Sequence, residues 1–229
     1  MTSRTTFGKI LRIIAIVFMS LTAAFTLMGG VGTSCVAFAP NNPGWVEMGS
    51  QLAQYQWLYI LFVIFTVVLG VMGVRAVILL VRSRPNAYRC SLVALLGGVV
   101  VGVIHILTSR ALRGSSMPVD MVVYTTVLTL VIFLLLRLPG LWQKVRFGEL
   151  DSAGTAGTAA GISLIVSGAL ALTIQYWMAG THTFNGVNVA DVWHTQLALI
   201  GGLAILMGVA VLGWVLSRRA APLPEAATA

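Results

Sequence analysis

The chain of 229 residues is 58% hydrophobic and only 9% charged, and its mean hydropathy is +0.95. A soluble globular domain carries about 25% charged residues, so this composition excludes a water-exposed fold and indicates a surface covered mostly by lipid. The net charge of +8 comes from basic residues beside apolar stretches, which is typical of membrane orientation signals and not of nucleic-acid binding.

Six apolar stretches follow one another along the chain. A helix needs about 20 apolar residues to cross about 30 Å of hydrocarbon. The fourth stretch is the shortest, between Asp120 and Arg137, and Arg75 near the end of the second can extend its side chain to the interface. We therefore expect an all-α, polytopic integral membrane protein with one six-helix domain over residues 1–220 and a disordered tail over 221–229. The expected spans are 10–28, 57–81, 91–108, 121–136, 155–178 and 195–216.

The first span resembles a signal peptide in its basic start and in the stretch Ala37-Phe38-Ala39, where cleavage is conceivable. Its apolar run of about 19 residues is longer than the usual 7–15, and Pro40 would follow the cut. We therefore expect an uncleaved helix. A longer outer loop should follow over residues 29–56, and it is expected to pack over the outer ends of the helices.

The basic residues predict the orientation, because short cytoplasmic loops are rich in Lys and Arg. On the outer side only Arg110 and Arg113 are basic. Both termini are therefore expected in the cytoplasm, in a multi-pass protein of the plasma or inner membrane. Cys35 and Cys90 would then lie on opposite sides of the bilayer and could not pair. The twelve basic residues of the inner side are Arg4, Lys9, Arg12, Arg75, Arg82, Arg84, Arg89, Arg137, Lys144, Arg146, Arg218 and Arg219.

Glycines at helical spacing indicate close helix packing in lipid. Gly98 and Gly102 form one GxxxG pair, Gly157 and Gly161 form another, and the sixth span is also glycine-rich. Such faces predict either tight packing within the chain or association with another membrane protein or a second copy. The glycines of the sixth span are Gly201, Gly202 and Gly208.

The segment 180–194, GTHTFNGVNVADVWH, combines two of the three histidines with one of six acidic residues. Asp191 and His194 are three residues apart and share a face if the segment is helical. If His182 folded back and His105 joined from the third span, the four side chains could bind zinc, copper or iron. The spacing matches no established motif such as HExxH.

Two other interpretations apply to the same residues. His105 and His194 are the one plausible pair for a bis-histidine haem. In the structural interpretation, which we prefer and which needs no cofactor, Asn188 caps a helix and Asp191 occupies its third position, where an acidic side chain suits the helix dipole.

Arg110 and Arg113 lie in SRALRGSS, the one basic cluster expected outside. Two arginines three residues apart can bind an anion, although they could equally pair with Asp120 or contact lipid phosphates. No Asp, Glu or Lys lies in the middle of a span, which argues against proton coupling, and no hydrolase motif appears.

Three functions follow from this pattern. The first expectation is a non-catalytic membrane subunit or scaffold, because nothing within the spans demands chemistry. The second is an outward-facing metal- or haem-binding protein that serves electron transfer. The third is a permease for a small neutral or anionic solute, which predicts a cavity through the bundle that ends near Arg110 and Arg113.

Overall fold

The computed structural model describes residues 5–41, 52–145, 147, 153–184 and 186–220. Over these residues the fold is all-α apart from one antiparallel pair of two-residue strands. Six helices are long and apolar enough to cross a membrane, as predicted. They are α1 (Thr6–Phe38), α3 (Gln56–Val81), α4 (Ala87–Arg113), α5 (Val119–Leu136), α7 (Ala153–Leu172) and α11 (His194–Ala220).

The first helix is longer than expected, because it continues to Phe38 through part of the predicted outer loop. In this extension Gly29 packs against Val122 of α5, where a Cβ would lie 3.1 Å from the valine side chain. The Thr33 hydroxyl donates a hydrogen bond to the Gly29 carbonyl oxygen. Residues 42–51 of that loop lie outside the described part of the chain. Its last described element is a 3-10 helix, η1 (Leu52–Tyr55). The predicted disordered tail, 221–229, also lies outside it.

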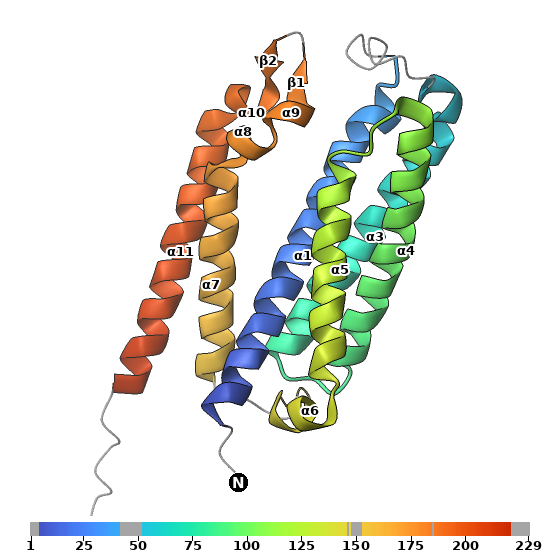
Figure 1. Ribbon diagram of the computed structural model, residues 1–229. Coiled ribbons are helices and arrows are strands. Elements are labelled where there is room, and N and C mark those ends of the chain that lie inside the picture. The colour runs from blue at the N-terminus through green and yellow to red at the C-terminus, as the bar shows by residue number, and fades with distance from the viewer. Residues whose placement is uncertain (1–4, 42–51, 146, 148–152, 185, 221–229) are drawn as a thin grey trace, which may run out of the picture.

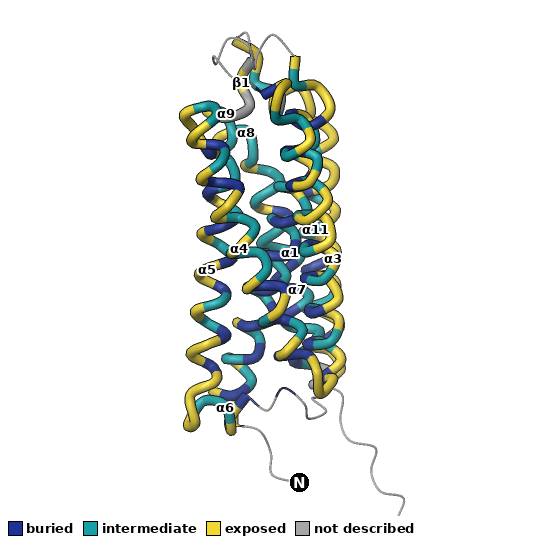
Figure 2. The backbone as a smooth tube through the Cα atoms, turned by 90° about the vertical axis from the view of Figure 1, so that its right-hand side faces the viewer, coloured by how far each residue is buried: buried dark blue, intermediate teal, exposed yellow. Residues whose placement is uncertain are grey.

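Four helices form a closed bundle. α1 packs against α3 and α5, and α4 packs against α3 and α5 from the other side (Figure 1). Exposed residues follow the outward faces of the helices and buried residues follow the inward faces (Figure 2). Because most exposed residues are large and apolar, lipid can cover the outside while the inside holds both apolar and polar side chains.

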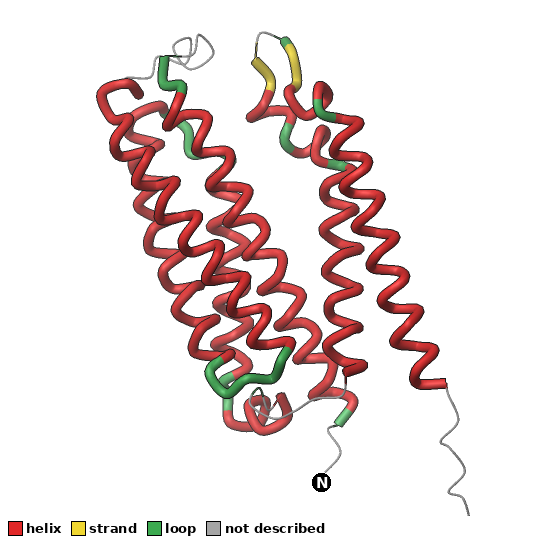
Figure 3. The backbone as a smooth tube through the Cα atoms, turned by 180° about the vertical axis from the view of Figure 1, so that it is seen from behind, coloured by secondary structure: helices red, strands yellow, loops and turns green. Residues whose placement is uncertain are grey.

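The remaining two long helices form a hairpin beside this bundle. α7 packs against α1, and α11 packs mainly against α7 (Figure 1). The fifth span was expected to reach residue 178, but α7 ends at Leu172. The helix is interrupted at Thr173, and a short helix begins at the next residue. Short elements connect the hairpin (Figure 3): α8 (Ile174–Trp177), α9 (Ala179–His182), β1 (Thr183–Phe184), β2 (Val187–Asn188) and α10 (Val189–Val192).

The two ends of the molecule differ. We call the end with α8 to α10 the cap end and the opposite end the terminal end, because α1 begins there and α11 ends there (Figure 1). The terminal end is closed by α6 (Pro139–Val145) and by an aromatic cluster in which the Tyr88 hydroxyl donates to the Phe133 carbonyl oxygen over 3.0 Å. There the buried Arg12 guanidinium also donates to the Leu80 carbonyl oxygen over 2.8 Å.

Candidate functional site in the four-helix bundle

The predicted metal ligands do not gather among the described residues. His105 is buried inside the bundle on α4, whereas His194 is exposed at the start of α11, on the far side of the molecule (Figure 1). Asp191 is also exposed, and the His182 side chain lies outside the described part. No group of three or more His, Cys, Asp or Glu side chains that could hold a metal ion occurs within the described chain. A site that joins His182, Asp191 and His194 stays a prediction.

The prediction that Asn188 caps a helix within the segment 180–194 is confirmed. Asn188 precedes α10, and its side-chain oxygen accepts a hydrogen bond from the backbone N–H of Ala190 over 3.0 Å. This is the geometry of a helix N-cap. The Asn188 side-chain amide also donates to the Gln175 carbonyl oxygen over 3.1 Å, which ties the start of α10 to α8.

His105 lies between two aromatic rings of α3. Its imidazole stacks on Phe62, with ring centroids 4.1 Å apart, and meets the edge of Tyr59 at 5.9 Å. The Tyr59 and Ser109 hydroxyl oxygens are 3.2 Å apart and form a second contact between the two helices. The spacing could have revealed this cluster, since Tyr59 and Phe62 share a face of one helix and His105 and Ser109 share a face of the other.

Asp120 joins α4 to α5 at the cap end. Gly114 ends α4 in a left-handed conformation, with φ of 69°, which reverses the chain direction. The buried Asp120 carboxylate then accepts a hydrogen bond from the Ser116 hydroxyl over 2.7 Å. It also forms an ion pair with Arg110, with nitrogen and oxygen 3.2 Å apart. Asp120 lies in the first turn of α5, where the helix dipole favours a negative charge.

The pairing of Arg110 with Asp120 limits what the arginines can bind. Arg110 also donates from Nε to the Ser116 hydroxyl over 2.9 Å, so its guanidinium is largely engaged. Arg113 donates to the Met117 carbonyl oxygen over 2.8 Å, and its buried Nε has no partner among the described residues. Anion binding by Arg110 and Arg113 together stays a prediction.

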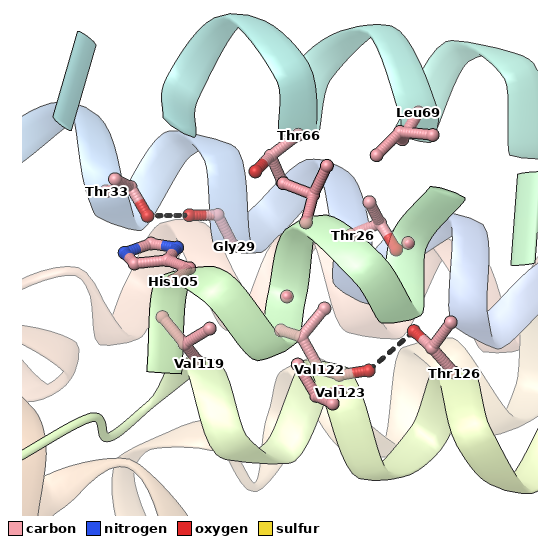
Figure 4. A pocket seen from close by; sticks show the side chains of 13 residues that line it. Thr26, Gly29, Thr33, Thr66, Leu69, His105, Val119, Val122, Val123 and Thr126 are labelled. Carbon is pink, nitrogen blue, oxygen red and sulfur yellow. Dashed lines mark hydrogen bonds between the residues drawn. The ribbon is translucent and has the colours of Figure 1, made fainter. Parts of the chain in front are cut away.

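Below this cluster, a small chamber lies at the centre of the bundle (Figure 4). Its volume is about 30 Å³, and His105 lies at one end of it. Each of the four helices contributes a polar side chain: Thr26 and Thr33 from α1, Thr66 from α3, His105 from α4 and Thr126 from α5. Polar side chains that the bundle encloses within membrane spans are the strongest feature of this site.

Three hydroxyl groups of the chamber have a defined hydrogen-bond direction. Thr26, Thr33 and Thr126 each donate a hydrogen bond to the carbonyl oxygen of the residue four positions earlier, over 2.7–2.8 Å. A hydroxyl that donates to its own helix can only accept hydrogen bonds from a ligand. These three hydroxyl groups therefore suit a ligand that donates hydrogen bonds.

Glycines of the third span determine how closely α4 approaches α5. A Cβ at Gly98 would lie 3.1 Å from the Thr126 side chain, and one at Gly102 would collide with Val123. This GxxxG pair therefore packs within the chain. Gly157 and Gly161 do the same, because both meet side chains of α11.

The fold and the site together describe a helical, multi-pass type of protein whose six apolar spans are consistent with a membrane location. Comparisons with protein-family models, with curated proteins and with solved structures found no match. The geometry of the site is therefore the basis for the function.

Proposed function

We propose that the protein is a multi-pass permease of the plasma or inner membrane that binds a small neutral solute in its four-helix bundle. The observation that carries this proposal is the chamber to which all four helices contribute a polar side chain, including His105. Polar side chains in the membrane interior cost free energy and commonly mark sites or pathways. The terminal end, which carries most of the basic residues, is assigned to the cytoplasm.

The lining of the chamber favours a neutral solute over an anion. No Asp, Glu, Lys or Arg side chain of the described chain lines it, and Asp120 already neutralises Arg110 at the cap end. A volume of about 30 Å³ corresponds to about two water molecules, since a cavity needs about 10–15 Å³ by this measure for each. The solute is therefore water or a molecule of a few heavy atoms that donates hydrogen bonds.

The test is solute flux into proteoliposomes, measured by stopped-flow light scattering with water, urea and glycerol. Thr126→Val removes one chamber hydroxyl at nearly constant shape, and Thr125→Val is the matched control. Thr125 makes the same bond to its own helix, over 2.7 Å, but does not line the chamber. We expect Thr126→Val to reduce the flux of at least one solute about tenfold, as the loss of about 1.4 kcal/mol would. Flux equal to that of protein-free vesicles, for every solute, would refute the proposal.

A membrane subunit or scaffold is the second candidate, because α11 has a large unoccupied apolar face. Leu199, Leu203 and Leu206 are exposed on this helix, and a Cβ at Gly202 or Gly213 would meet nothing within 4 Å. Small residues beside large ones let a second helix approach closely. This function predicts that the protein purifies from its own membrane with a second chain, and that Gly202→Leu weakens the association at least tenfold. A chain that remains monomeric would contradict it.

A further inference from the structure

A column of buried polar side chains leads from the chamber to the cap end. His105, at one end of the chamber, meets the edge of the Tyr59 ring, and the Tyr59 and Ser109 hydroxyl oxygens are 3.2 Å apart. All three side chains are buried. Beyond them the Arg113 guanidinium lies close to Tyr59 and to Asp120, and Asp120 is paired with an arginine whose side chain is 56% exposed. Polar side chains therefore follow one another from the chamber to the surface of the bundle.

The opposite direction, from the chamber to the terminal end, is filled differently. The Thr22 and Thr129 hydroxyl oxygens are 2.7 Å apart below the chamber. Beneath them lies a large apolar cluster that includes Ile16, Leu95 and Phe133. A solute that crosses such a cluster must give up its hydrogen bonds, which costs free energy. The polar column is therefore the less costly route between the chamber and the solution.

The Tyr59 ring closes this route. It contacts His105 on the chamber side and lies close to Arg113 on the cap side, so it stands between the chamber and the surface. The 3.2 Å between its hydroxyl and that of Ser109 is longer than the distance of about 2.7–2.8 Å that is usual for two hydroxyl groups. The contact of Thr22 with Thr129 has the usual length of 2.7 Å. The weaker of the two closures is therefore the one at the cap end.

We propose that Tyr59 is a gate, and that the solute enters the chamber from the cap end when the Tyr59 ring turns away from His105 and Ser109. This inference rests on the proposed permease function, because only a solute of the chamber needs the route. The hydrogen bond between Tyr59 and Ser109 holds the gate shut, since it joins α3 to α4 directly above the chamber. Loss of this bond raises the fraction of molecules in which the chamber is open to the cap end.

The experiment measures how fast a charged methanethiosulfonate reagent, which does not enter lipid, modifies a cysteine in the chamber. The reporter is Thr33→Cys, because Thr33 is buried and lines the chamber beside His105 (Figure 4). The chain's own cysteines are replaced by Cys35→Ala and Cys90→Ala. The full chain is held in nanodiscs, so that both ends face the solution. We expect modification to be slow compared with that of the same chain unfolded in SDS.

Two variants of the reporter chain release the gate. Tyr59→Phe keeps the ring but lacks the hydroxyl, so we expect the rate to rise about fivefold, the factor by which the loss of one hydrogen bond shifts an equilibrium. Ser109→Ala removes the other half of the same bond and should also raise the rate, and the double variant should not exceed Tyr59→Phe. Tyr88→Phe is the matched control. It removes a buried tyrosine hydroxyl that bonds α4 to α5 at the terminal end, over 3.0 Å, and should leave the rate unchanged.

Three results would overturn the gate. The first is an equal rate in the reporter chain, in Tyr59→Phe and in Ser109→Ala. The second is a rate in the reporter chain that already equals that of the unfolded chain. The third is a rise in Tyr88→Phe as large as that in Tyr59→Phe, which would place the route at the terminal end. If Thr33→Cys does not fold, Thr26→Cys serves as the reporter, because Thr26 is also buried and lines the chamber.

The modification rate does not depend on solute flux, so failure of the gate and failure of the permease are distinguishable. Modification as expected, together with flux equal to that of protein-free vesicles, would refute the permease and leave a gated binding site. Flux through the protein, together with equal modification rates in all variants, would refute the gate alone.

Discussion

The four-helix bundle and the hairpin use the same small residues in different ways. In the bundle, glycines face side chains of the neighbouring helix, as Gly70 faces Leu27 and Gly98 faces Thr126. In the hairpin, Gly157 also faces a side chain, but Gly168 faces backbone, because a Cβ there would lie 2.5 Å from the Gly201 carbonyl oxygen. The first arrangement leaves room for polar side chains at the centre. The second joins two helices into one rigid unit with no interior between them.

The same contrast separates the two hollows of the molecule. The chamber is lined by four helices and offers hydroxyl groups and an imidazole, which suits a small polar solute. The crevice of about 170 Å³ between the bundle and the hairpin presents apolar walls and no such hydrogen-bonding groups. Variants that affect one unit and leave the other intact will therefore show whether the units are independent.

The largest loss in the free energy of unfolding is expected from Gly168→Val, which forces α7 and α11 apart where a Cβ would collide with backbone. A Cβ there meets both the Gly201 carbonyl oxygen and the Ile205 side chain, so the clash includes backbone that cannot move alone. Overpacking of this kind costs about 3 kcal/mol. The free energy of unfolding is measured by SDS titration in mixed micelles. Gly202→Val is the matched control, because nothing lies within 4 Å of a Cβ at that position, and an equal loss in both variants would contradict the packing.

A smaller loss in the free energy of unfolding is expected from Asp120→Ala in the bundle. The variant removes two hydrogen bonds from the carboxylate, leaves Ser116 without its acceptor and leaves Arg110 without its ion pair. Because the Arg110 side chain is 56% exposed, water compensates part of this loss, and we expect about 2 kcal/mol by the same titration.

The control for this variant is Asp191→Ala, whose carboxylate is exposed in the cap of the hairpin. It should change the free energy of unfolding by less than about 0.5 kcal/mol, as exposed substitutions commonly do. Comparable losses in the two variants would mean that Asp120 does not hold α4 and α5 together.

The spans could be predicted from sequence because the thickness of the bilayer requires a certain length of apolar helix. The structure confirms six spans and extends α1 by ten residues, from 28 to 38. That extension escaped prediction because residues 29–38 are rich in small and polar residues, and sequence alone does not show that Gly29 packs against Val122 of α5.

The site could not be predicted in the same way, because lipid and protein interior are both apolar and hydropathy does not reveal which face of a helix is inside. The segment 180–194 concentrates polar residues in one short stretch, whereas the threonines of the chamber are distributed over α1, α3 and α5, so no local pattern marks them. The usable signal was spacing: Thr22 and Thr26 are four apart on α1, and Thr126 and Thr129 are three apart on α5. GxxxG spacing indicated close packing but could not identify the partner helix.

The smallest effect we predict tests how these threonines close the bundle. The Thr22 and Thr129 hydroxyl oxygens are 2.7 Å apart and both residues are buried, so this hydrogen bond joins α1 to α5 below the chamber. In a double-mutant cycle with Thr22→Val and Thr129→Val, we expect a coupling energy of about 0.6 kcal/mol, the average for hydrogen bonds between membrane helices. Thr173 is exposed and donates only within the α7 segment, so a cycle of Thr22→Val with Thr173→Val should show no coupling. A coupling near zero for the first pair would mean that packing of α1 on α5, and not this hydrogen bond, closes the bundle there.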